Sequence, residues 1–214
     1  MKATQMSQRV FKNTSEIAAL SNALLHILPV RRFTVAEYHR MEEAGLLGED
    51  ERVELIDGWI LTMSPIGSRH AACVSLLNRV LRPVEETAIV RVEDPITLND
   101  DTEPQPDIAV VKFKANLYAD AHPCPADVLL LIEVAETSLE EDREIKLPRY
   151  AASSIPEVWI VNLVANIIEV YREPLILANG LPGYRSRTDF IPGEPMHPQA
   201  FVDLEIQFCI PMSA

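Results

Sequence analysis

A chain of 214 residues is long enough for one well-packed domain with elaborations, and short for two independent ones. Its net charge of −13 argues against a general electrostatic grip on nucleic acid, which normally requires clustered Lys and Arg. No apolar run approaches the ~20 residues of a membrane helix, so we expect no membrane association and a cytoplasmic location. The odd number of cysteines, without paired or metal-ligand spacing, predicts reduced thiols.

The N-terminal part predicts two helices. Residues 1–30 are expected to form an appendage, one amphipathic helix ended by Pro29. Next, TVAEYHRMEEAG predicts a helix with Thr34 as its N-cap, Glu37 as the capping-box partner and Gly45 at the C-terminal end.

The middle of the chain alternates between extended and helical patterns. In RVELIDGWILTM, Asp57-Gly58 between two short apolar runs is a strong signal of a β-hairpin. Apolar residues then recur at helical spacing over 68–87, although Pro83 should kink or end the last turn. AIVRV, PDIAVV and DVLLLIEVA predict three strands. The last is apolar over 128–132, as expected of a central strand covered on both faces.

The last third predicts a further helix and more strands. SLEEDREIKLPRYAAS suits a helix with Ser138 as N-cap and Glu141 at capping-box spacing, which Pro148 should disturb. PEVWIVN and IIEVYR predict a strand pair, and the chain beyond Pro174 predicts loop with one or two edge strands. The order of elements therefore predicts an α/β fold with a mixed central sheet flanked by helices. Ligands of such sheets tend to bind outside the strand ends.

Acidic residues are concentrated in three segments. Residues 49–57, 93–107 and 133–146 hold 5, 6 and 6 acidic residues against 1, 0 and 2 basic ones. If the segments converge, they make a divalent-cation site, whereas each one alone also suits a solvated loop. Asp107 at the mouth of one apolar strand and Glu133 inside the end of the next need an explanation. A carboxylate in such a strand is costly unless it is paired, hydrogen-bonded or bound to a cation.

Five stretches together carry a family resemblance. VELIDGWILTMSP, RHAACVSLLNRVL, EPQPDIAVV, LLIEVAETSLEEDREIKLPRYAASSIPEVWIVN and IIEVYR resemble the bacterial putative restriction endonucleases of the PD-(D/E)XK nuclease superfamily. The resemblance covers roughly 33–173, in the family's order, and leaves out 1–30 and 180–214. We therefore expect an N-terminal helical extension at 1–30, a restriction-endonuclease-like domain at 31–175, and C-terminal loop and edge strands of the same domain at 176–214.

The resemblance implies a metal-dependent phosphodiesterase. Asp107 is then the aspartate of PD, Glu133 the acidic residue of the second strand, and Glu54 on the hairpin a third carboxylate of the metal site. With a backbone carbonyl near Val134 and waters they suit Mg²⁺, or Mn²⁺ as a substitute, because hard cations prefer oxygen ligands. The metal would polarise a phosphoryl oxygen and lower the pKa of the attacking water.

Each carboxylate also has an ordinary structural interpretation. An isolated PD is a common turn-to-strand dipeptide, so Asp107 alone is weak evidence of catalysis. Glu133 also suits a carboxylate satisfied by backbone amides or a buried arginine, and Glu54 suits an exposed strand residue.

The lysine departs from the superfamily pattern. It is expected at position 135, which is Ala135. In the family that the chain resembles it is found on the following helix, where DREIK places Lys146. Asp142 and Tyr150 are its i,i+4 neighbours, so one helical face could present Lys146 to the carboxylates, to position water or stabilise transition-state charge. The alternative is a surface Asp142–Lys146 ion pair that contributes little.

Weaker candidates surround this set. Gln105 and Glu103 lie beside Asp107 and are expected to support the site only indirectly. His70 could contact a substrate phosphate, but a histidine at a helix start is more often exposed or capping. The remaining histidines show no ligand-like spacing: His26, His39, His122 and His197.

Two classes of function remain open. The first is a Mg²⁺-dependent endonuclease that hydrolyses DNA phosphodiester bonds, expected as a homodimer because that would let it cut both strands. The second is a non-catalytic module acting in protein interaction or regulation, which the net charge of −13 favours. The set Glu54, Asp107, Glu133 and Lys146 favours the enzyme. A local basic rim could come from five residues whose placement only the fold decides: Arg69, Arg79, Arg82, Lys112 and Lys114.

Overall fold

The computed structural model describes residues 30–48 and 51–210. The helix expected within residues 1–30 falls almost wholly outside the described residues, and the predicted division at residues 30 and 175 stays a prediction. Among the described residues, no helix has both the length and the apolar character to cross a membrane.

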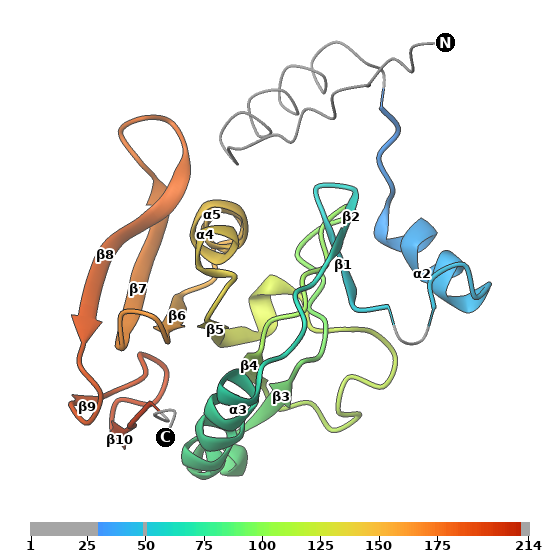
Figure 1. Cartoon of the computed structure of the whole chain (residues 1–214). Coiled ribbons are helices and arrows are strands. Elements are labelled where there is room, and N and C mark those ends of the chain that lie inside the picture. The colour runs from blue at the N-terminus through green and yellow to red at the C-terminus, as the bar shows by residue number, and fades with distance from the viewer. Residues whose placement is uncertain (1–29, 49–50, 211–214) are drawn as a thin grey trace, which may run out of the picture. The chain divides into compact units, whose positions relative to one another are not determined.

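The described residues form four α-helices and ten strands (Figure 1). The helices are α2 (Val35–Glu43), α3 (Ser68–Val80), α4 (Leu139–Glu141) and, after a π-helical turn at Asp142–Lys146, α5 (Leu147–Ala152). The strands are β1 (Val53–Ile56), β2 (Trp59–Thr62), β3 (Ala88–Val92), β4 (Ile108–Lys112), β5 (Val128–Ala135), β6 (Glu157–Asn162), β7 (Ile167–Ile176), β8 (Pro182–Phe190), β9 (Pro195–Met196) and β10 (Ile206–Gln207). Short 3-10 turns occupy Arg82–Glu86 and Pro125–Asp127.

A six-stranded sheet in the order β3-β4-β5-β6-β7-β8 organises the domain. Only β5 and β6 pair in parallel, and the other neighbours are antiparallel. A parallel pair needs a crossover connection, and here the segment α4 to α5 supplies it. The predicted mixed sheet flanked by helices is therefore confirmed.

Both faces of the central strands are buried, as the apolar run over 128–132 predicted. Side chains of a strand alternate between faces, so Ile108 and Val110 pack with α3 and the C-terminal segment, whereas Ala109 and Val111 pack with Tyr150 of α5. Figure 1 shows α3 and the α4–α5 segment on opposite sides of these strands. The site described below lies where these layers meet the hairpin.

Local sequence signals account for several element ends. The capping box of Thr34 and Glu37 is present at α2. Asp57 and Gly58 have φ of 50° and 75° in the β1–β2 turn, the left-handed conformation that such a hairpin requires. The helix that begins at Ser68 ends at Val80, and a 3-10 turn with Pro83 in its first turn follows it.

Two local predictions need correction. Ser138 is the N-cap residue of α4, as predicted, but its side chain makes no capping bond, because its hydroxyl donates instead to Oδ2 of Asp142 at 2.8 Å. Beyond Pro174 the chain holds more strand than expected. β7 continues to Ile176 and pairs with β8 of 9 residues. Pro174 is tolerated because, within the described part of the chain, β7 has no partner on its β6 side beyond Arg172.

Candidate active site

The β1–β2 hairpin carries Glu54 into the domain interior. Its side chain is 1% exposed, and Oε2 accepts a hydrogen bond from the backbone N–H of Gln105 at 3.0 Å. Leu55 and Glu103 exchange backbone hydrogen bonds, which holds the segment before Asp107 against β1. The exposed-strand interpretation of Glu54 is therefore wrong.

Antiparallel pairing of β4 with β5 brings Asp107 and Glu133 together. Ile108 lies opposite Ile132. Asp107, just before Ile108, is therefore a neighbour of Glu133, just after Ile132. Oδ2 of Asp107 accepts the N–H of Val134 at 2.6 Å, and Oε2 of Glu133 accepts the N–H of Asp107 at 3.4 Å. The two carboxylates are thus held by each other's strand.

Lys146 enters the same space from the π-helical turn. Its Nζ lies 3.1 Å from Oε2 of Glu54 and 3.6 Å from Oε1 of Glu133, and the side chain is 7% exposed. A surface pair with Asp142 is therefore ruled out. π-helical turns are rare in proteins, and those that occur often lie at functional sites. This one buries both Asp142 and Lys146.

The electrostatics of the cluster follow from burial around one cation. Burial raises the pKa of Glu133 well above its ordinary value, although Lys146 opposes the rise. Burial lowers the pKa of Lys146, but Glu133, Glu54 and Asp142 outweigh it and the net shift is upward. Lys146 is therefore charged at neutral pH. Burial also raises the pKa of Asp142 to about 6.

Tyr150 of α5 also contacts the cluster. Its hydroxyl donates to Oε1 of Glu133 at 2.5 Å, and burial followed by the nearby carboxylates raises the pKa of the tyrosine. In the sequence, Tyr150 stood out only as a helical neighbour of Lys146. Its contact depends on the crossover, which no local pattern reveals.

His70 at the start of α3 is the main correction among the weaker candidates. Its Nε2 lies 2.9 Å from Oδ1 of Asp107, so it faces the carboxylates and is neither exposed nor a helix cap. Burial lowers the pKa of His70, but the Asp107 carboxylate outweighs it, and the net shift is upward. Glu103, expected to support the site only indirectly, does not line this pocket with its side chain.

The pocket formed by these side chains suits a hydrated cation. Glu54, Asp107, Glu133, Lys146 and His70 all line a cavity of about 60 Å³, enough for an ion with a few waters. One ligand atom each of His70, Glu93 and Asp107 lies within 4.8 Å of the others. Glu93 had not been singled out, and its φ of 54° is its only unusual local feature. The carboxylate oxygens of the pocket fit Mg²⁺ or Mn²⁺. Asp107 belongs both to the residues that line the pocket and to the group with His70 and Glu93.

The fold defines the class of protein. The structure resembles that of a putative nuclease belonging to DUF820 from Anabaena variabilis ATCC 29413, with a TM-score of 0.59 and 20% sequence identity. The match covers 79% of this chain and 94% of that one. The chain therefore shares the fold of that protein.

The family follows from the sequence of the same region. Residues 35–208 match the model of the Uma2 family, described as putative restriction endonuclease. The chain belongs to this family, as the resemblance over 33–173 implied. Among the curated proteins, none matches the chain.

Proposed function

We propose that this protein is a cytoplasmic Mg²⁺-dependent endonuclease that hydrolyses DNA phosphodiester bonds, with Mn²⁺ able to replace Mg²⁺. The observation that carries the proposal is the convergence of Glu54, Asp107, Glu133 and Lys146, from four separate segments, on one pocket. Membership of the putative restriction endonuclease family supports nuclease chemistry in general. The roles of the individual residues are our inference.

Asp107, Glu133 and Glu54 would hold the metal, with Glu93 close enough to contribute. When bound, Mg²⁺ polarises a phosphoryl oxygen and lowers the pKa of the attacking water. The bonds from the Gln105 and Val134 backbone N–H groups orient the carboxylates of Glu54 and Asp107 before any metal arrives. Such outer contacts fix the direction of ligand oxygens.

Lys146 would act on the substrate's charge. Its ammonium is buried and charged, and it lies beside two of the proposed ligands. A preorganised cation in a site shielded from water stabilises the charge that builds up on the scissile phosphate. His70, held against Asp107, would contact the phosphate from the start of α3.

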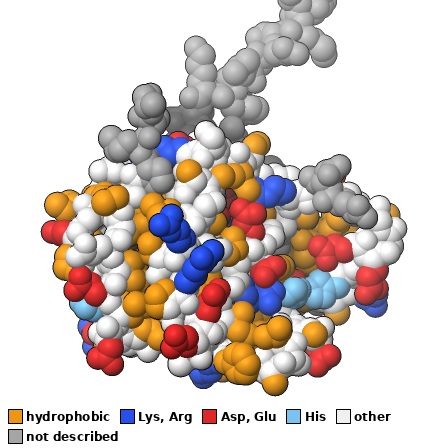
Figure 2. Space-filling model, turned by 90° about the horizontal axis from the view of Figure 1, so that it is seen from below, with side chains coloured by type: hydrophobic (Ala, Val, Ile, Leu, Met, Phe, Trp, Pro, Cys, Tyr) orange, Lys and Arg blue, Asp and Glu red, His pale blue; other side chains and the backbone are white. Residues whose placement is uncertain are grey.

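None of the five basic residues expected as a rim lines the pocket. Arg52, which was not among them, does. Lys112 is the last residue of β4 and Lys114 follows it, at the end of the strand away from Asp107. Lys112 donates to the Ala126 carbonyl and Lys114 pairs with Asp127. On the face seen in Figure 2, Lys and Arg are interspersed with Asp and Glu. DNA would therefore be held through local contacts.

A non-catalytic module remains the second candidate because Lys146 already pairs with two of the carboxylates. In such a module the pair would simply neutralise the pocket, and the fold would serve protein interaction or regulation. The net charge of −13 is in keeping with that role.

Nicking of supercoiled plasmid with Mn²⁺ separates the two candidates. Wild type and Glu173→Gln, a control at an exposed carboxylate outside the pocket, are expected to nick equally. Asp107→Asn and Lys146→Ala, purified identically, should be at least a hundredfold slower. Equal nicking by all four proteins would overturn the enzyme and leave the non-catalytic module.

We also propose a homodimer, the commonest closed assembly, which would allow cleavage of both strands. Sedimentation of the intact chain and of a form lacking residues 1–29 tests this and the contribution of that segment. A monomer at high micromolar concentration for the intact chain would contradict it.

A further inference from the structure

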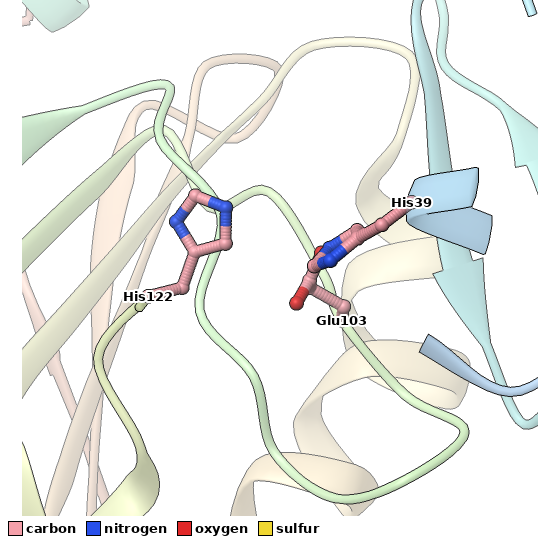
Figure 3. A group of neighbouring side chains, drawn as sticks. All are labelled: His39, Glu103 and His122. Atoms are coloured by element: carbon pink, nitrogen blue, oxygen red, sulfur yellow. The ribbon is translucent and has the colours of Figure 1, made fainter. Parts of the chain in front are cut away.

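A second group of metal-binding side chains lies apart from the nuclease pocket: His39, Glu103 and His122 (Figure 3). His39 comes from α2, Glu103 from the segment before β4, and His122 from the segment before β5. One ligand atom from each lies within 4.8 Å of the others. The sequence shows no ligand-like spacing here, since His39 and Glu103 are 64 positions apart.

Glu103 is the centre of the group and is deeply buried. Its side chain is 1% exposed, Oε1 lies 2.6 Å from Nε2 of His39, and Oε2 accepts the Thr97 hydroxyl at 2.6 Å. Within residues 30–48 and 51–210, no Lys or Arg pairs with this carboxylate. A buried carboxylate without a permanent cation partner is costly. A bound metal ion would supply the cation that this carboxylate lacks.

His122 has a ring that is still free to coordinate. It lies edge-on to His39, with centroids 5.9 Å apart and an interplanar angle of 72°. Across the described ranges, its ring nitrogens make no hydrogen bond. Figure 3 shows His39 and His122 approaching from opposite sides, with Glu103 nearer His39.

The backbone around the group is held firmly. Glu103 exchanges two backbone hydrogen bonds with Leu55 of β1. The N–H of Thr97 donates to the carbonyl of Pro123, the residue after His122, at 3.0 Å. Backbone hydrogen bonds therefore connect the segments around the three ligands. A cleft of about 260 Å³, lined by Glu103 and His122, would let an ion reach them. An entry path and a fixed framework are what a metal site requires.

We propose that His39, Glu103 and His122 bind a transition-metal ion, Zn²⁺ or one like it, with solvent completing its coordination. Two imidazole nitrogens and one carboxylate oxygen are a known zinc donor set, whereas Mg²⁺ prefers oxygen alone. Tetrahedral zinc with bonds of about 2.0–2.2 Å holds its ligand atoms about 3.3–3.6 Å apart. Small rotations of the two partly exposed rings would bring the three ligand atoms to that spacing. The Thr97 hydroxyl orients Glu103 as outer groups orient metal ligands.

This site is a neighbour of the nuclease pocket and chemically distinct from it. Gln105, whose backbone N–H holds Glu54, lies two positions after Glu103 and borders both cavities. A bound Zn²⁺ would join α2 and the segment before β5 to the stretch that leads to Asp107. The proposal does not depend on the proposed nuclease activity.

Zn²⁺ titration of the full-length chain tests the site in an Asp107→Asn background, which weakens the competing pocket. After chelator treatment, one equivalent of Zn²⁺ should bind, and millimolar Mg²⁺ should not displace it. Adding His39→Ala or His122→Ala should weaken the affinity at least tenfold, the lower end of the effect of altering even an outer group. Adding His197→Ala, at an exposed histidine, should leave it unchanged.

His39→Ala also removes the contact with Glu103 and could destabilise the protein for that reason alone. The His122→Ala variant avoids this problem. His122 makes no hydrogen bond to lose among the described residues, so its metal-free melting temperature should match the background's. Lost Zn²⁺ binding with unchanged melting supports the site. Equal Zn²⁺ affinity in the His122→Ala, His197→Ala and background proteins would overturn it.

Discussion

Buried carboxylates occur in two regions of this molecule, and their surroundings differ. On β6 and β7, Glu157 and Glu169 have fully buried side chains. Glu157 accepts from Arg172, from Trp159 at 2.8 Å and from the N–H of Gln199 at 2.6 Å. Each thus has an arginine and further donors of its own.

Glu169 shows the consequence for charge. It accepts from Arg143, from Tyr171 at 2.7 Å and from Asn162 at 3.1 Å. Burial raises the pKa of Glu169, but these donors outweigh it and the net shift is downward. Its negative charge is fully satisfied within the protein, which is the arrangement expected of a structural carboxylate.

In the proposed active-site pocket the carboxylates do not each have a cation of their own. Glu54 and Glu133 share one cation, Lys146, and the pKa of Glu133 is raised. Burial combined with incomplete compensation leaves negative charge available to an incoming cation, a pattern that clusters at functional sites. Burial alone therefore does not separate structural from functional carboxylates. The difference lies in the cation: Glu157 and Glu169 each pair with an arginine of their own, whereas Glu54 and Glu133 share Lys146.

Removing a satisfied carboxylate should cost the most stability. Glu169→Ala is expected to lower the free energy of unfolding by about 3 kcal/mol, the lower end for breaking a buried pair, because Arg143 can rehydrate. Mn²⁺ affinity should not change. Urea denaturation and calorimetric titration measure the two quantities, with Glu173→Ala as the exposed control. A loss below 1 kcal/mol would remove the distinction between the two regions.

Removing the shared cation should act on catalysis. Lys146→Ala is expected to slow plasmid nicking about a hundredfold, equivalent to about 2.7 kcal/mol of barrier. Mn²⁺ affinity should stay the same or improve slightly, because a competing cation has gone. Lys146→Met, which keeps the aliphatic stem, controls for lost packing. If nicking fell only in proportion to lost metal affinity, Lys146 would have no separate role.

The raised pKa of Asp142 predicts that the Asp142→Asn variant gains stability in a pH-dependent way. Its pKa rises from 3.8 to about 6, so the folded protein binds the proton more tightly, and wild type loses stability as pH rises between these values. Asp142→Asn should therefore be near neutral at pH 4 and stabilising by up to about 3 kcal/mol above pH 6. Thermal melts across this pH range measure it. A gain that did not vary with pH would point to a cause other than ionisation.

The smallest change in stability is expected at Asp107. Without metal, Asp107→Asn should shift the free energy of unfolding by less than about 1 kcal/mol, or raise it, because one of several like charges is removed. Mn²⁺ at a hundredfold excess over Kd should stabilise wild type by about 2.7 kcal/mol and the variant not at all. Equal Mn²⁺ stabilisation of both proteins would place the metal elsewhere.

The sequence alone determined the features that depend on neighbours along the chain. The capping box at Thr34, the Asp57-Gly58 turn, the end of α3 before Pro83 and the apolar run of β5 were all predictable. Caps, turns and side-chain periodicity act within a few residues, so their signals stand in the sequence itself.

Only the tertiary structure decided which distant groups meet. The burial of Lys146, the contact of His70 with Asp107, and the placement of Glu103 beside His39 rather than in the pocket depend on the packing of α2, α3 and the crossover. Ser138 likewise bonds Asp142 because the π-helical turn brings that carboxylate back to it. No local pattern encodes such contacts, because their energies arise from burial and from charges that are far apart along the chain.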